Sequence, residues 1–157
     1  MPNAIPEGLS SITAQLVVDG AAEAIAFFQK AFGAQEVMRA PDPSGKKVWH
    51  AIVRIGNTSL FVNDAFPEMG ATATPTRLWL YLDGGDAAFQ RAVVAGATVR
   101  MPLTDMFWGD RLGAVVDRWG NQWTLAQHMK DLSPQQMKEA QDVATAQWKP
   151  AENASAK

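Results

Sequence analysis

An internal duplication constrains the fold of this 157-residue chain more than any other feature of its sequence. The tetrapeptide Arg54-Ile55-Gly56-Asn57 recurs as Arg118-Trp119-Gly120-Asn121, and the segment FFQKAFGA of the first half resembles FQRAVVAGA of the second. A repeat of this length is a duplicated supersecondary unit, because solenoid repeats are shorter, at roughly 20 to 50 residues. Each copy alone would leave one sheet face uncovered, so the two copies must pack together.

Hydrophobic periodicity predicts the same order of elements in both copies. The first copy is expected to form a strand at 12–18, a helix at 21–32 and strands at 35–39, 48–55 and 59–63. The second copy is expected to form a strand at 77–82, a helix at 86–95 and strands at 98–103, 112–116 and 122–126. Gly33 and Gly96 follow the two helices and are typical of helix ends.

The predicted fold class is therefore α+β, with two pseudo-symmetric βαβββ modules that form cupped mixed sheets, and with a C-terminal helix. One domain over residues 1–130 holds the halves at about 11–63 and 77–128. The linker at 64–76 contains two Pro and no periodicity. Residues 131–157 are expected to form the C-terminal helix and a flexible tail.

The start of the C-terminal helix is marked by Ser133 as N-cap, Pro134 at the first helical position and Gln136 as the capping-box partner. The helix should end near Gln147. Because it carries few large apolar residues, we expect it to lie on the surface or to reach a partner subunit.

Composition excludes several classes of protein. The absence of Cys excludes disulfides, thiolate metal sites and a Cys nucleophile, and fits a reducing, cytoplasmic location. No leader-like segment and no run near 18 apolar residues occurs, so neither export nor a membrane span is expected. With 14 Lys plus Arg against 16 Asp plus Glu and no basic stripe, nucleic acid is not an expected partner.

The paired units, the Gly-Asn turns and the segment ATVRMPLTDMFWGDRLG resemble the vicinal oxygen chelate superfamily, and in particular its PhnB-like branch, grouped with glyoxalase and bleomycin-resistance proteins. The resemblance covers about residues 10–131. It implies that each half supplies four cupped strands whose concave faces form the site. It also implies that metal-binding members place their ligands on the first and last strand of each half.

The ligand positions that this resemblance implies do not carry metal ligands in this chain. They fall at Thr13, at Leu60 or Phe61, at Arg77 and at Thr124. Divalent metals prefer imidazole or carboxylate in such a setting, and the cation of Arg77 would suit an anionic ligand better. We therefore expect no metal and no cofactor.

Alternation along the strand at 77–82 indicates which side chains face the site. Arg77, Trp79 and Tyr81 alternate with leucines, which should face the helices. Aromatic walls with a few polar groups are typical of small-molecule pockets, although a solvated sheet face or a dimer contact would show the same pattern. The residues expected to bind a ligand are Gln15, Arg54, Arg77, Trp79, Tyr81, Phe107, Trp108, Arg111, Gln122 and Thr124.

The loop at 107–111 admits two interpretations. Phe107 and Trp108 could offer a stacking surface with Arg111 as an anion clamp. Alternatively, Gly109 permits a tight turn and Asp110 and Arg111 pair locally.

Two other side chains need an assignment. His50 is the best candidate for a general base, although a strand histidine can also be a structural, hydrogen-bonded residue. His128 is expected on the surface. Trp123 should face the helices as part of the core.

These observations favour metal-independent binding of a small aromatic or anionic molecule by a PhnB-like homodimer. A metal-dependent lyase, isomerase or dioxygenase of the same superfamily is an alternative, as is a protein-interaction module that uses a Trp-rich face. Whether the chain is an enzyme stays open at this stage.

Overall fold

The structure is a computed structural model that describes residues 1–150; residues 151–157, which belong to the expected flexible tail, lie outside the described residues. The elements in chain order are β1 (Gln15–Val18), α1 (Ala21–Phe32), β2 (Gln35–Pro41), β3 (Val48–Ile55), β4 (Thr58–Asp64), the 3-10 helix η1 (Pro67–Met69), β5 (Arg77–Tyr81), α2 (Gly85–Val94), β6 (Thr98–Asp105), β7 (Asp110–Val116), β8 (Gln122–His128) and α3 (Pro134–Gln147). No helix within residues 1–150 is both long and apolar enough to cross a membrane.

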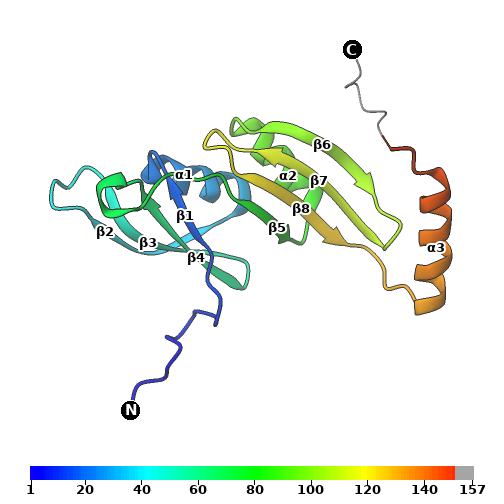
Figure 1. The fold of residues 1–157 in the computed structure, drawn as a ribbon, viewed down its shortest axis with the longest axis horizontal. Helices are drawn as coiled ribbons and strands as arrows, with labels where there is room; N and C mark the ends of the chain where they lie inside the picture. Colours follow the sequence, from blue (N-terminus) through cyan, green and yellow to red (C-terminus); the bar gives the residue numbers. More distant parts are fainter. Residues whose placement is uncertain (151–157) are drawn as a thin grey trace.

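The two copies of the repeat form two separate four-stranded sheets, with strand orders β1-β4-β3-β2 and β5-β8-β7-β6. In each sheet the first and last strands of the copy pair in parallel, and the other pairs are antiparallel. The sheets lie side by side, and α3 stands beyond the second sheet (Figure 1). This arrangement confirms the α+β fold class with two βαβββ units and a C-terminal helix.

Several strand ends differ from those that the sequence predicts, and three of these differences concern the expected site residues or their neighbours. The first strand begins at Gln15, because Thr13 turns back and its hydroxyl donates to the carbonyl of Ser10 at 3.2 Å. In the second half, β7 begins two residues earlier than predicted and β8 ends two residues later. Asp110 and His128 face each other across these extensions, and both prove important for the site.

The helices are fixed to their sheets by polar side chains at equivalent places in the two halves. The carboxylate of Asp64, at the end of β4, accepts the N–H groups of Gly20 and Ala21, where α1 begins, at 2.8 and 3.0 Å. In the second half the side-chain oxygen of Gln127 accepts the N–H of Gly85 at the start of α2. Each bond satisfies free N–H groups at a helix start.

The two halves share one core through an aromatic cluster of α1 and β8. The ring centroid of Trp123 lies 5.1 Å from that of Phe28 and 4.6 Å from that of Phe32. Trp123 is only 1% exposed, as the sequence predicts for a core residue. A further link joins the halves where the Trp119 indole donates to the carbonyl of Asp19 at 2.8 Å.

The two matching tetrapeptides adopt different turns. Ile55 pairs with Thr58 across a two-residue turn, whereas the second copy lies in a five-residue connection between β7 and β8. The cause is Asp117, whose buried carboxylate accepts the N–H groups of Trp119 and Asn121 and the indole N–H of Trp123.

We expect Trp123→Ala to lower the free energy of unfolding by roughly 3 to 5 kcal/mol, because it removes a buried ring and leaves a cavity between the halves. Urea denaturation measures this loss. The matched change Trp79→Ala, at a side chain that is 52% exposed, should stay within about 0.5 kcal/mol of the wild type. Equal losses in the two variants would contradict the assignment of Trp123 to the core.

Candidate functional site

Each sheet packs one face on the helices and leaves the other uncovered. In the second half this uncovered face, called here the second open face, carries Arg77, Trp79 and Tyr81 of β5. Strand register adds Gln122, opposite Arg77, and Thr124, opposite Trp79. Because side chains of directly paired residues share a face, five of the ten expected ligand-binding residues lie together.

The centre of the second open face is an exposed aromatic platform. Trp79 is 52% and Tyr81 55% exposed, and their rings lie 6.4 Å apart with an angle of 31° between their planes. Beside them lie two smaller side chains, Thr124 and, opposite it on β7, Ala114. Large flat rings next to small residues can accept a planar ligand.

One end of the second open face is hollow. A cavity of about 270 Å³ lies where β5 and β8 begin, with Arg77 and Gln122 in its lining. The aromatic platform and a cationic cavity are therefore adjacent, since Arg77 and Trp79 are two residues apart on one strand.

The remaining expected residues of the first half lie on the uncovered face of the other sheet, called here the first open face. The amide of Gln15 donates to the side-chain oxygen of Asn63 at 2.8 Å. The ring of His50 contacts Phe61 edge-on, with centroids 4.7 Å apart. Arg54 lies on the same strand as His50, four residues further on, so the two side chains point to the same face. The sheets share no strand pairing, so these residues form a group separate from the second open face.

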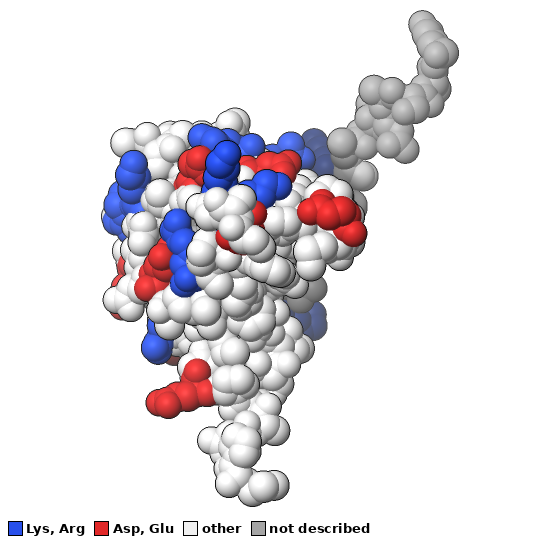
Figure 2. Space-filling model, turned by 90° about the vertical axis from the view of Figure 1, so that its left-hand side faces the viewer, with Lys and Arg blue, Asp and Glu red and all other residues white. Residues whose placement is uncertain are grey.

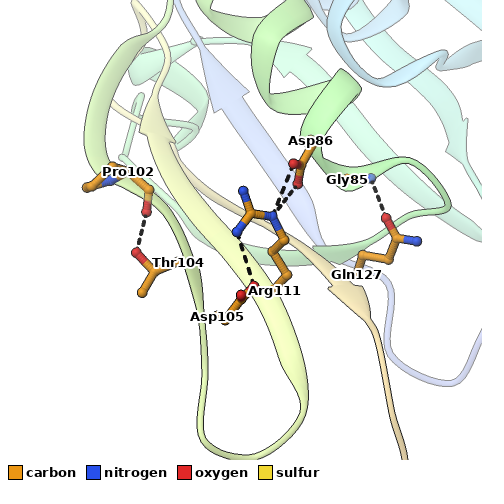
Figure 3. Close-up of polar contacts among 7 residues, drawn as sticks. All are labelled: Gly85, Asp86, Pro102, Thr104, Asp105, Arg111 and Gln127. Carbon is orange, nitrogen blue, oxygen red and sulfur yellow. Dashed lines mark hydrogen bonds and ion pairs between the residues drawn. The ribbon is translucent and has the colours of Figure 1, made fainter.

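Arg111 does not join either group. It pairs with Gln127 in register, on the helix side of the sheet, and its guanidinium binds Asp86 at 3.0 Å and Asp105 at 3.1 Å (Figure 3). Hydrogen bonds from Arg111 to Asp105 and Asp86 raise the pKa of the guanidinium. The Arg111 side chain therefore links Asp86 of α2 to Asp105 of β6. A guanidinium with two carboxylate partners is a structural contact more than an anion clamp.

Phe107 and Trp108 lie in the turn between β6 and β7, with their rings edge to face at 5.0 Å. The turn depends on Gly109, which adopts a positive φ of 100°, and a Cβ there would lie 2.3 Å from the carbonyl oxygen of Lys130. That contact is too short for any other residue. The turn is therefore held against the segment that follows β8.

Sequence reasoning missed a buried carboxylate at the far end of the second open face. Asp110 is 4% exposed and accepts hydrogen bonds from Tyr81 at 2.7 Å, from the Trp108 indole at 2.9 Å and from Nδ1 of His128 at 2.7 Å. Nε2 of His128 faces Asp131 at 3.0 Å. The spacing of Tyr81, Asp110 and His128 in sequence carries no sign of this cluster, because three strands bring them together.

The cluster changes the acidity of its members. Burial alone would raise the pKa of Asp110, but the donors from His128, Tyr81 and Trp108 outweigh it and hold the pKa below its usual value. Hydrogen bonds to Asp110 and then Asp131 raise the pKa of His128. The hydrogen bond to Asp110 also raises the pKa of Tyr81. Both shifts favour the ionised form of Asp110 and the protonated form of His128 relative to the isolated groups.

The site residues do not fit a metal ion. The second open face offers Arg77, Trp79 and Thr124 at its centre. The first open face offers Gln15, Phe61 and the single imidazole of His50, so neither face supplies a set of imidazole and carboxylate ligands. Within residues 1–150, no group of three or more His, Cys, Asp or Glu side chains lies close enough to hold a metal.

Charge on the outer surface is mixed. Figure 2 shows Lys and Arg side chains interspersed with Asp and Glu on the face seen from the first-half end, with no continuous basic stripe there.

A groove of about 910 Å³ runs between α1 and α2, on the helix side, and none of the expected ligand-binding residues lines it. The second open face is therefore the better candidate site.

We expect the stability that His128 contributes to depend on pH. Because its folded pKa is raised, the contribution is fully present below the unfolded value of about 6.5 and is lost as the pH rises through the folded pKa. The variant His128→Gln does not titrate, so the difference in unfolding free energy from the wild type should be largest at acid pH and shrink as the pH rises. Urea denaturation across this range measures it, with Asp131→Asn as a control for the outer contact. A difference independent of pH would contradict the prediction.

Comparison with known proteins finds a matching family and similar proteins in other organisms. The family model described as Glyoxalase/Bleomycin resistance protein/Dioxygenase superfamily matches residues 9–125. An uncharacterized protein of Mycobacterium bovis is 42% identical over 139 residues, which cover 83% of this chain and 91% of that protein. An uncharacterized protein of Mycobacterium tuberculosis is also 42% identical over 139 residues, covering 83% of this chain and 81% of its own length.

Solved structures agree in fold. TioX from Micromonospora sp. ML1 has a TM-score of 0.64 at 25% identity, covering 76% of this chain and 99% of its own. The PhnB protein from Bacillus cereus, titled a putative 3-demethylubiquinone-9 3-methyltransferase, has a TM-score of 0.61 at 21% identity, covering 75% and 99%. From the family model and the fold together, the chain belongs to the glyoxalase/bleomycin resistance protein/dioxygenase superfamily.

Proposed function

We propose that this chain binds a small aromatic or anionic molecule on the second open face, without a metal. The observation that carries the proposal is the convergence of Arg77, Trp79 and Tyr81 with Gln122 and Thr124 on one uncovered sheet face. A flat aromatic floor with a cation and an amide at its end suits a planar ligand that carries a polar group. The DMFWGDR segment supports the further proposal that the chain lies in the PhnB-like branch, whereas the likeness to the Bacillus cereus protein is one of fold alone.

A ligand on the second open face would be half-solvated in a single chain, so we also propose that a second copy completes the pocket. Large apolar side chains stay exposed on β2, β3 and β5: Val37 is 60%, Met38 40%, Trp49 45% and Trp79 52% exposed. We propose that these side chains contribute to the interface, since burying them would remove apolar surface from water. An interface between copies would bury them and shield the ligand from water.

The binding proposal is tested by isothermal titration with a panel of small aromatic molecules, beginning with 2-naphthoate. We expect Trp79→Ala to weaken binding about 10-fold, because the ring that stacks on the ligand is lost, while the melting temperature changes little. Trp148→Ala, at an exposed indole after α3, is the matched control and should bind like the wild type. Binding should be unchanged by a chelator. Absence of binding across the panel would refute the proposal.

The proposed assembly predicts a particle of twice 17.0 kDa in light scattering after gel filtration. Trp49→Asp should shift the equilibrium toward the monomer, because a charge in the interface would be desolvated. Val94→Asp, at an 87% exposed side chain on α2, should leave it unchanged. A monomeric wild-type protein at all concentrations would exclude the shared pocket.

A further inference from the structure

Arg100 lies with Arg77 in the lining of the 270 Å³ cavity, although it is not among the ligand-binding residues that the sequence predicts. Arg77 is on β5 and Arg100 on β6, the two edge strands of the second sheet. The floor between them comes from the two central strands, through Val116 of β7 and Gln122 of β8. The two guanidinium groups therefore flank the same cavity from opposite edges of the sheet.

Strand alternation places Arg100 on the side of this cavity. Thr98, two residues earlier on β6, pairs with Val116, which lines the cavity. Val99 pairs with Val115 and Met101 with Ala114, so Arg100 itself has no partner on β7. Such β-bulges are common beside functional sites.

Neither arginine is neutralised by the protein. Within residues 1–150 no carboxylate lies within 4.0 Å of Arg77 or Arg100, and neither side chain donates a hydrogen bond to another residue. Arg39 and Arg111, by contrast, each bind a carboxylate. Two cations around one cavity repel each other, and an anion between them would remove that repulsion.

We propose that this cavity binds the carboxylate or phosphate group of an aromatic ligand whose ring lies on Trp79. The inference rests on the proposed function and names its ligand class. A guanidinium binds planar oxyanions through two parallel hydrogen bonds, and the amide of Gln122 adds a further donor. The cavity holds only the anionic end, because whole-ligand pockets measure roughly 300 to 1,000 Å³. Arg77 and Trp79 are two residues apart on β5, which separates their Cα atoms by about 7 Å.

The test uses isothermal titration to compare two probes of nearly the same shape, the anion 2-naphthoate and the neutral 2-naphthamide. The wild type should bind 2-naphthoate about 10-fold or more tightly than 2-naphthamide, since charge-assisted hydrogen bonds form only with the anion. Added salt should weaken only the binding of 2-naphthoate. In Arg100→Met the preference should disappear while the affinity for 2-naphthamide is kept.

Arg118→Met is the matched control, because Arg118 lies over the Trp119 ring at 4.8 Å and is not part of the cavity. It should keep the preference for 2-naphthoate. Equal affinities of the wild type for the two probes would overturn the anion site and leave the proposed function standing. An equal loss of preference in Arg100→Met and Arg118→Met would also overturn it. Binding of neither probe would overturn this inference, and the wider panel of aromatic molecules then tests the proposed function by itself. Unchanged circular dichroism and melting temperature of both variants establish that they fold.

Discussion

The packing of Trp123 against Phe28 and Phe32 is the contact on which the rest of the structure depends. It joins the helix of the first half to the last strand of the second, at centroid distances of 5.1 and 4.6 Å. Neither βαβββ unit could bury both a sheet face and a helix stripe alone. Because α1 and α2 both pack in the shared core, neither helix covers the other face of its sheet. The two open faces are a direct consequence of this core.

Buried polar side chains in this core and at its edge are hydrogen-bonded. Within residues 1–150 every buried side-chain nitrogen and oxygen has a hydrogen-bond partner. Asp117 fixes the turn beside Trp123, Asp64 fixes the start of α1, and Asp110 joins Tyr81 to His128. Such networks specify one geometry, since an unpaired buried carboxylate is costly. The edges of the second open face are therefore rigid, which favours a preorganised site.

Local pattern was enough for much of the fold and for part of the candidate site. The helix at 21–32 and the strand at 48–55 have the predicted bounds, because their apolar spacing decides the structure by itself. The common face of Arg77, Trp79 and Tyr81 follows from alternation in the same way. The position of Arg100 beside Arg77 was not predicted, because it depends on the order in which the four strands of the second sheet pair. Non-local pairing likewise decides the positions of Asp110 and His128.

The duplication also explains why the two open faces differ. In register, Val17 of the first half occupies the place of Tyr81, and Phe61 occupies that of Thr124. The first open face is therefore more apolar at its centre, while the second holds small and polar groups between aromatic rings. The helix-capping side chains Asp64 and Gln127 do the same work in both halves, since the fold requires them. Positions under that requirement keep their role after duplication. Positions on the open faces are free of it, so the two faces can differ in the side chains that they present.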